Sequence, residues 1–298
     1  MICRPTLGSV APLFLVKRVG SADAHRVRGE IYKEVIISED GHRMEDDLPR
    51  HRVTYIGHAS AMFQSERASI VMDPIFSERL ATFFGRRLKP LRFDPRDVRN
   101  LAGILISHGH HDHMDLRSLK MLGKGTPIIV PRGVSLPLKL RRFRDVRILR
   151  PWSQVDLDGF RVSVVPSHHF GGRPPFYFTA GYQGYVVDGG SSVYFAGDTG
   201  FDAQMFREIG GKFKIDLAML PIGAYHPPSF RKHHMSPEDA LEAFRLLGAK
   251  RMMPIHFETF NMSWEPIDEP RRRLLAKAES LGIKGSVVVL ESGESTEV

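Results

Sequence analysis

One short run of the sequence places at least four potential metal ligands within six residues. It reads Ser-His-Gly-His-His-Asp-His over residues 107–113 and directly follows an apolar stretch that ends at Ile106. The four candidate ligands are His108, His110, Asp112 and His113. Imidazole suits zinc, iron, nickel and copper, and a carboxylate adds an anionic oxygen. On an irregular loop, His108 and His110 can face one metal while Asp112 and His113 turn toward another. The run therefore indicates a metallohydrolase, against the alternative of a solvated histidine-rich loop.

A site with two metals needs further ligands, and three other apolar runs end at suitable residues. They end before His168-His169, before Asp198 and at His256. In open α/β sheets, ligands gather beyond the carboxyl ends of the strands, which is where these residues would lie. Each of them alone would more often be a turn residue or a hydrogen-bonded buried group. Together with the first run they form a set.

Several segments resemble a known family in the same order along the chain. The segments are Tyr55 to Ser60, Met72 to Ser77, Ile104 to Asp115, Tyr194 to Gly200, Leu220 to Tyr225, His234 to Ala240 and Ile255 to Phe260. They resemble the metallo-β-lactamase fold superfamily, and within it the N-acylphosphatidylethanolamine-hydrolysing phospholipase D type. The resemblance covers roughly Arg52 to Leu281.

The resemblance implies a ligand for each position of a dinuclear site. The first metal would be held by His108, His110 and His169, the second by Asp112, His113 and His256, and Asp198 would bridge them. His169 is preferred to His168 because the family pattern places the ligand three residues after Pro166 and before an aromatic residue. His111 falls at a variable position and is expected to be a cleft-wall residue. Two Zn²⁺ ions are the default, and Mn²⁺ or Fe is also compatible with such ligands.

The metals imply the chemistry. Two divalent ions hold a bridging hydroxide at neutral pH, stabilise charge on the attacked group and clamp the leaving oxygen. Asp112 would be the catalytic residue, because it would orient the hydroxide as well as bind the second metal. Metal-bound histidines need hydrogen-bond acceptors on their other ring nitrogen, and Asp73 is the expected partner. The alternative for Asp73 is a turn residue before Pro74.

Three residues are candidates for binding the substrate: His234, His58 and Tyr225. His234 precedes a predicted helix that has Ser236 as its N-cap and Pro237 at its first position, where an oxyanion or phosphate could be met. The other two match family motifs, and for both a structural hydrogen bond is the alternative.

The segment Leu80 to Phe93 interleaves apolar and aromatic residues with basic ones. Such a mixture is typical of peripheral contact with anionic lipid, or of a lid. The alternative is that the aromatic residues pack inward. The formal charge of +8 and pI of about 9.7 also favour anionic substrates or surfaces. A nucleic acid is not expected, because the additional substrate-gripping segments of nucleases with this fold are not found.

Length and composition predict one α/β domain over residues 51–298, with residues 1–50 as an N-terminal tail or extra strands of the same unit. The chain has 298 residues, of which 42% are hydrophobic and 26% charged. Alternating strands and helices favour a four-layer αββα sandwich, although the pairing of the two sheets comes from the resemblance. The predicted elements include a strand over Asp156 to Val165 and helices over Leu116 to Leu122, Pro237 to Leu247 and Pro270 to Leu281.

Cys3 is the sole cysteine, so intramolecular disulfides are excluded. The apolar stretch Leu7 to Val16 is far shorter than the roughly 20 residues that span a bilayer. We therefore expect a cytoplasmic protein with peripheral membrane contact as an option.

The leading functional hypothesis is cleavage of a phosphodiester, with an N-acylphosphatidylethanolamine-like phospholipid as the expected substrate. The alternatives are a sugar-phosphate lactonase or another hydrolase of this fold, and a metal-binding protein without turnover. All seven candidate ligand positions are filled, which favours an enzyme.

Overall fold

Two β-sheets position the loops that carry the predicted ligands in the computed structural model, which describes residues 51–80, 84–171 and 180–298. The prediction for residues 1–50, a tail or extra strands of the same unit, lies outside the described residues. So does the centre of the segment Leu80 to Phe93, at residues 81–83.

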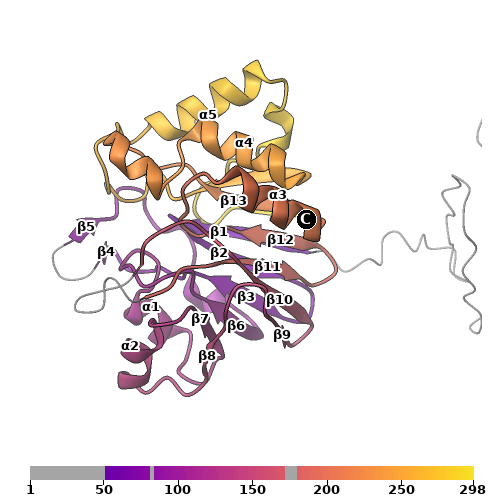
Figure 1. Cartoon of the computed structure of the whole chain (residues 1–298). Coiled ribbons are helices and arrows are strands. Elements are labelled where there is room, and N and C mark those ends of the chain that lie inside the picture. The colour runs from indigo at the N-terminus through magenta and orange to yellow at the C-terminus, as the bar shows by residue number, and fades with distance from the viewer. Residues whose placement is uncertain (1–50, 81–83, 172–179) are drawn as a thin grey trace, which may run out of the picture. The chain divides into compact units, whose positions relative to one another are not determined.

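The first sheet has seven strands in the order β15-β1-β2-β3-β6-β7-β8 (Figure 1). The strand β2 pairs antiparallel with β1 on one side and with β3 on the other. The strands β3, β6, β7 and β8 are parallel to one another. Their bounds are β1 Arg52–Gly57, β2 Ser60–Gln64, β3 Ser69–Met72, β6 Leu101–Leu105, β7 Ile128–Val130, β8 Val146–Ile148 and β15 Ser295–Glu297. A separate pair consists of β4 (Arg79–Leu80) and β5 (Phe84–Arg86).

The second sheet has six strands in the order β14-β13-β12-β11-β10-β9, of which β12, β13 and β14 are parallel. Their bounds are β9 Gln154–Leu157, β10 Phe160–Val165, β11 Gly184–Asp188, β12 Ser192–Phe195, β13 Leu217–Pro221 and β14 Arg251–Ile255. The prediction of one strand over Asp156 to Val165 is wrong. The chain reverses at Asp158 and Gly159, whose φ angles are +40° and +89°, as a two-residue hairpin turn requires.

Helices cover the outer faces of the two sheets. Leu119 of α1 and Leu138 of α2 pack with Ile104 and Ile128 of the first sheet. The helices α3, α4 and α5 pack on the second sheet. Their bounds are α1 Leu116–Met121, α2 Ser135–Leu140, α3 Ala203–Lys212, α4 Pro237–Leu247 and α5 Glu269–Ser280, with short 3₁₀ turns η2 Pro95–Asp97, η3 Pro228–Lys232 and η4 Lys284–Ser286.

The two sheets face one another across a buried apolar core. Phe63 of β2 and Phe160 of β10 are both buried, and their ring centroids are 5.4 Å apart. The order of layers is therefore helix, sheet, sheet, helix, which confirms the predicted αββα sandwich (Figure 1). Among the described residues, no helix combines the length and apolar character needed to cross a membrane.

Local sequence signals explain the helix ends. The α4 helix begins after Ser236, whose hydroxyl accepts from the Asp239 backbone while the Asp239 carboxylate accepts from the Ser236 backbone. It ends at Gly248, which has a φ of +63°. The predicted bounds of α4 are confirmed, those of α1 differ by one residue at its C-terminal end, and those of α5 differ by one residue at each end. The α2 and α3 helices and the strands β2, β4, β5, β8, β11, β13 and β15 were not predicted.

Two glycines, Gly248 and Gly211, can show how backbone conformation alone affects stability, because a side chain at either position would contact nothing. A Cβ at Gly248 would meet nothing within 4 Å, and its positive φ disfavours every other residue. A Cβ at Gly211 of α3 would also meet nothing, but its φ is not positive. We expect Gly248→Ala to lower the free energy of unfolding by about 1 kcal/mol and Gly211→Ala to raise it by about 0.5 kcal/mol. Urea denaturation measures both values, and equal effects would contradict the explanation.

Candidate metal centre

The predicted ligands come together because each follows the end of a strand. His58 follows β1, and the segment of residues 107–113 follows β6. His169, Asp198 and His256 follow β10, β12 and β14. Residues at the ends of parallel strands meet at the same edge of a sheet, and here the two packed sheets combine their edges. Segments nearly two hundred residues apart in the sequence thus contribute to one cluster.

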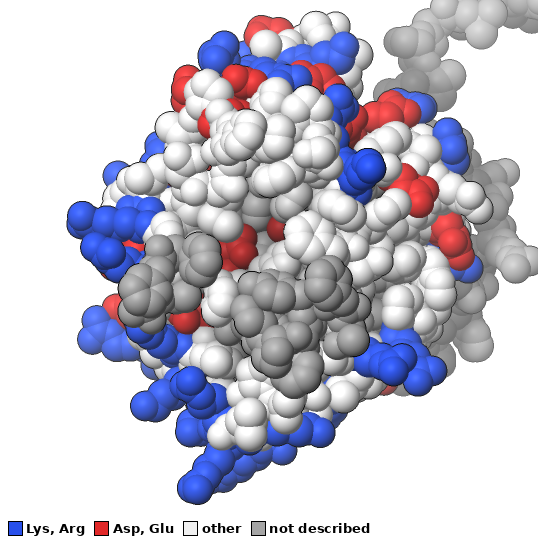
Figure 2. Space-filling model, turned by 60° about the vertical axis from the view of Figure 1, so that its left-hand side comes forward, with Lys and Arg blue, Asp and Glu red and all other residues white. Residues whose placement is uncertain are grey.

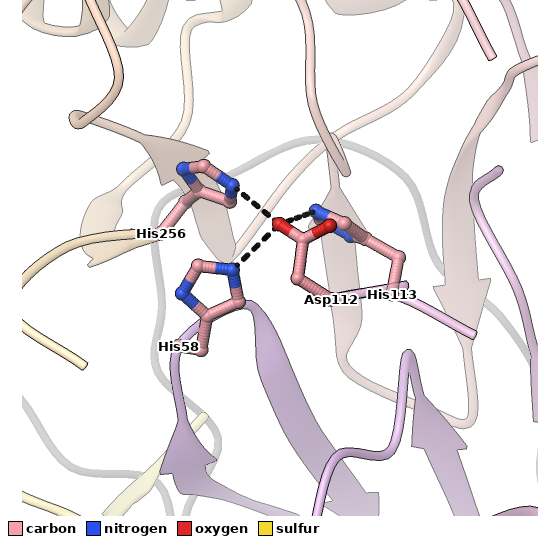
Figure 3. A group of neighbouring side chains, drawn as sticks. All are labelled: His58, Asp112, His113 and His256. Atoms are coloured by element: carbon pink, nitrogen blue, oxygen red, sulfur yellow. Dashed lines mark hydrogen bonds and ion pairs between the residues drawn. The ribbon is translucent and has the colours of Figure 1, made fainter. Parts of the chain in front are cut away.

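Asp112 is the centre of one group of side chains (Figure 3). Its Oδ2 atom lies 3.0 Å from Nε2 of His58, 3.2 Å from Nε2 of His256 and 3.4 Å from Nε2 of His113. All four residues are buried. Three imidazoles from three different loops therefore converge on one carboxylate oxygen.

A second group consists of three histidines. Nε2 of His108 lies 2.9 Å from Nδ1 of His110, and Nε2 of His169 lies 3.4 Å from the same Nδ1 atom. His108 and His169 are buried, and His110 is half-buried. Three ring nitrogens at this separation can share one metal ion as ligands.

Asp198 lies between the two groups. Its Oδ2 atom is 3.1 Å from Nε2 of His113 and 3.2 Å from Nε2 of His256. The same oxygen is 4.0 Å from Nε2 of His108 and 3.9 Å from Nε2 of His169. One carboxylate therefore adjoins both sets of histidines, as the predicted bridging role requires.

Hydrogen bonds fix which ring nitrogen of each histidine is protonated. Nδ1 of His169 donates to the backbone carbonyl of His233 at 2.9 Å, because a carbonyl can only accept. The Ser107 hydroxyl donates to Asp73, so its oxygen accepts from Nδ1 of His108 at 2.9 Å. Nδ1 of His113 lies 2.7 Å from Oδ2 of Asp73. These three histidines thus direct the Nε2 lone pair into the cluster, which is the tautomer that metal binding needs.

The cluster concentrates negative charge in a buried place. Burial opposes ionisation of Asp112 and Asp198, but the neighbouring histidines outweigh it and hold the pKa of both carboxyls well below its usual range. Burial lowers the pKa of His108 and His169 well below the ordinary value. Burial also opposes protonation of His256, yet Asp198 and Asp112 raise its pKa to about 9. The two carboxylates therefore attract any available positive charge.

Several buried polar atoms in the cluster have no hydrogen-bond partner among the described residues. They include Nε2 of His113, Oδ1 of Asp198 and Nδ1 of His234. Unpaired buried polar atoms are costly and uncommon in folded proteins. Together with the other imidazoles and the two carboxylates, these atoms form a donor set that fits divalent metal ions.

Three residues of the site have a left-handed backbone conformation. The φ angles are +58° at His58, +42° at Asp73 and +59° at His256. Such angles are unfavourable for residues with a Cβ atom. Each of these residues directly follows a strand, and the turn directs its side chain toward the cluster instead of onward along the sheet.

The other residues singled out in the sequence lie at different distances from the cluster. The side chain of His168 is 54% exposed, so His169 and not His168 joins the cluster. His111 is half-buried. Nδ1 of His234 lies 3.8 Å from Oδ2 of Asp198, and burial lowers the pKa of His234 to about 4. Tyr225 is buried with its hydroxyl donating to Glu269 of α5 at 2.8 Å, which is the structural alternative considered for it.

A small pocket of about 20 Å³ beside the cluster was not predicted. Its wall includes His58 and His256 from the cluster together with Phe260, Met262 and Ile267. Met262 and Ile267 are partly exposed, and Trp264 between them is 81% exposed. The signal available in the sequence was this group of large apolar residues in a loop without helical or strand periodicity.

The structure also describes part of the segment Leu80 to Phe93. Leu80, Arg87 and Phe93 are buried, and the Arg87 guanidinium donates to the backbone carbonyl of Ile75 at 2.7 Å. Leu88 is 55% exposed. Part of this segment therefore packs inward, and its contact with lipid stays a prediction.

Known proteins resemble this chain over most of its described length. The β-lactamase superfamily domain matches residues 68–257. An uncharacterised protein of Mycobacterium tuberculosis is 32% identical over 247 residues, which are 78% of this chain, and the chain spans 65% of that relative's length. N-acyl-phosphatidylethanolamine-hydrolyzing phospholipase D 1 of Caenorhabditis elegans is 32% identical over 242 residues, covering 74% of this chain and 68% of the relative.

A solved structure has the same fold. It is Igni18, a metallo hydrolase from Ignicoccus hospitalis, with a TM-score of 0.65, 24% identity, and coverage of 84% of this chain and 98% of its own. The layer order, the strand-end cluster and these similarities agree. The chain therefore belongs to the metallo-β-lactamase fold superfamily.

Proposed function

We propose that this protein is a dinuclear metal-dependent hydrolase. One metal would be held by His108, His110 and His169, and the other by Asp112, His113 and His256. The observation that carries the proposal is the position of Asp198, whose Oδ2 atom lies within 4.0 Å of a ring nitrogen from each of four of these histidines. Zinc is the expected metal because imidazole predominates, and manganese or iron would also be accepted by this donor set.

Bound at these ligands, divalent ions would supply Lewis acidity and lower the pKa of water to near neutrality. The residues of the chain then have separate tasks. Asp112 is oriented by His58, whose Nε2 atom lies 3.0 Å from its Oδ2 atom, so that its carboxylate can accept a hydrogen bond from the attacking water. His234 is neutral and lies at the cluster, where one ring N–H can donate to an oxygen of the substrate.

We further propose that the substrate is a phosphodiester in an N-acylphosphatidylethanolamine-like phospholipid. Water would attack phosphorus and the bond to the ethanolamine oxygen would break, giving a phosphatidic acid and an N-acylethanolamine. The Caenorhabditis elegans relative carries this activity in its name. The apolar side chains of Phe260, Met262 and Ile267 beside the cluster are suited to contact with the hydrocarbon chains of such a substrate.

Replacement of Asp112 by Asn tests the catalytic role. We expect kcat/KM to fall at least about 100-fold, because the amide cannot accept a proton and loses the negative charge. Hydrolysis of an N-acylated phospholipid in mixed micelles and of a small phosphodiester should be measured together. Asp156→Asn, an exposed carboxylate, is the matched control. Full activity in the Asp112 variant would contradict the mechanism. Activity on a sugar-phosphate lactone alone would favour the lactonase alternative.

Asp73 provides a test that does not depend on turnover. Its carboxylate accepts from the Ser107 backbone, from the Ser107 hydroxyl and from His113, and an amide cannot accept all three. We expect Asp73→Asn to weaken metal binding by about 10- to 100-fold, as measured by competition with a chromogenic chelator. Unchanged affinity would show that Asp73 does not orient a metal ligand.

Metal removal should change the stability of the folded chain. We expect elemental analysis of the purified protein to find about two metal ions, and chelation to lower Tm, because ligands that bind only the folded state stabilise it. Adding zinc should restore Tm in the natural protein and not in a variant with both His113 and His256 replaced by Ala. A metal-free protein with the same Tm before and after zinc addition would exclude the dinuclear site. Metal binding without hydrolysis of any tested ester would favour the non-catalytic alternative.

A further inference from the structure

One stretch of the chain contains all of its excess positive charge. Between Leu116 and Arg150 there are ten Lys or Arg residues and a single acidic residue, Asp145. The whole chain has a formal net charge of +8, so the residues outside this stretch are close to neutral in sum. The stretch includes α1, α2 and β8, and it follows directly after the metal-binding run.

Most of these cations face solvent without a partner. Six exposed ones form what we call the basic patch: Arg117, Lys120, Lys139, Arg141, Arg142 and Arg144. Within the described part of the chain, the one ion pair made by this stretch joins Arg147 to Asp145 at 2.7 Å. Their charge is therefore not neutralised locally, and it acts outward on whatever approaches this surface.

Large apolar side chains lie exposed among the same cations. Leu140 is 73% exposed, Met121 63% and Leu136 43%. In α2, Leu138 is buried against the sheet, while Leu136 and Leu140 are four residues apart and share the opposite face of the helix. These leucines do not complete the core, and water is an unfavourable environment for them.

The cations and the apolar side chains belong to one surface. Both α1 and α2 pack on the same face of the first sheet, through Leu119 and Leu138. The two helices are neighbours in Figure 1. Figure 2 shows Lys and Arg gathered along the lower edge of a face whose centre is hollowed, with acidic side chains visible in the hollow.

We propose that the basic patch, together with Met121, Leu136 and Leu140, docks this protein on an anionic lipid bilayer surface. Cations would meet the headgroups, and the three apolar side chains would enter the boundary between headgroups and acyl chains. Because α1 begins three residues after His113, docking through this helix brings the metal-binding run close to the membrane.

A nucleic acid fits the same surface less well. Single-stranded nucleic acids stack on exposed aromatic rings, and the sole aromatic residue between Leu116 and Arg150 is Phe143, which is buried. Exposed leucine and methionine side chains add nothing to contact with phosphates, whereas they contribute directly to partition into a bilayer. The exposed leucine and methionine side chains therefore favour an anionic bilayer over a nucleic acid.

The test is vesicle binding by the full chain. Vesicles of phosphatidylcholine alone should be compared with vesicles of phosphatidylcholine and phosphatidylglycerol in equal parts, by flotation. We expect binding to the anionic vesicles, weakened by salt. Lys139→Glu, Arg141→Glu and Arg142→Glu combined should reduce the partition coefficient at least about tenfold. Leu136→Ser with Leu140→Ser should reduce the binding that persists at high salt.

The matched control reverses three exposed cations on the other side of the sandwich, Arg207, Lys214 and Lys277. It should bind as the natural chain does. Equal loss in the control and the patch variant, or no loss in the patch variant, would overturn the proposal. So would patch-dependent binding to duplex DNA without binding to vesicles. These vesicles contain no N-acylated phospholipid, so the result is independent of the proposed hydrolysis, and an unchanged Tm verifies that each variant is folded.

Discussion

The structure depends on holding two ionised carboxylates inside the protein. Asp112 and Asp198 are both buried, and isolated buried charges are too costly to keep. Here they are kept because imidazole nitrogens from six histidines surround them at 3.0 to 4.0 Å. The histidines are in turn fixed by a carboxylate, a hydroxyl and a backbone carbonyl. The acceptors orient the histidines, and the oriented histidines stabilise the two carboxylates. Residues at the strand ends of both sheets are needed to make these contacts.

Much of the site could be predicted because its residues follow a rule of the backbone. Strands end at recognisable points in the sequence, and the residues just beyond them must meet at one edge. This rule predicts from the sequence that His108, Asp198 and His256 lie together. The αββα layering was predicted from alternating strands and helices together with the family resemblance, since strand patterns alone do not determine which sheet a strand joins.

Other features could not be predicted because they depend on packing between distant segments. The turn that divides β9 from β10 is a different case, because its signal is local: Asp158-Gly159 is a strong hairpin signal, whereas the alternating pattern on both sides of it predicts a single strand. Tyr225 matches a family motif, yet its hydroxyl contacts Glu269, forty-four residues away. The small pocket beside His256 is lined in part by the loop that contains Met262 and Ile267, and loop conformations follow from long-range contacts instead of periodicity.

The left-handed backbone at His58, Asp73 and His256 has an energetic consequence. Each strained residue costs of order 1–3 kcal/mol, whereas a whole domain is typically stable by about 5–15 kcal/mol. Three such residues can thus consume a substantial share of the margin that keeps the chain folded. Burial of the apolar core in such a protein therefore has to stabilise the fold by more than these three residues destabilise it. Attempts to make it more heat-resistant by relaxing these turns with glycine would remove the side chains for which the strain is maintained.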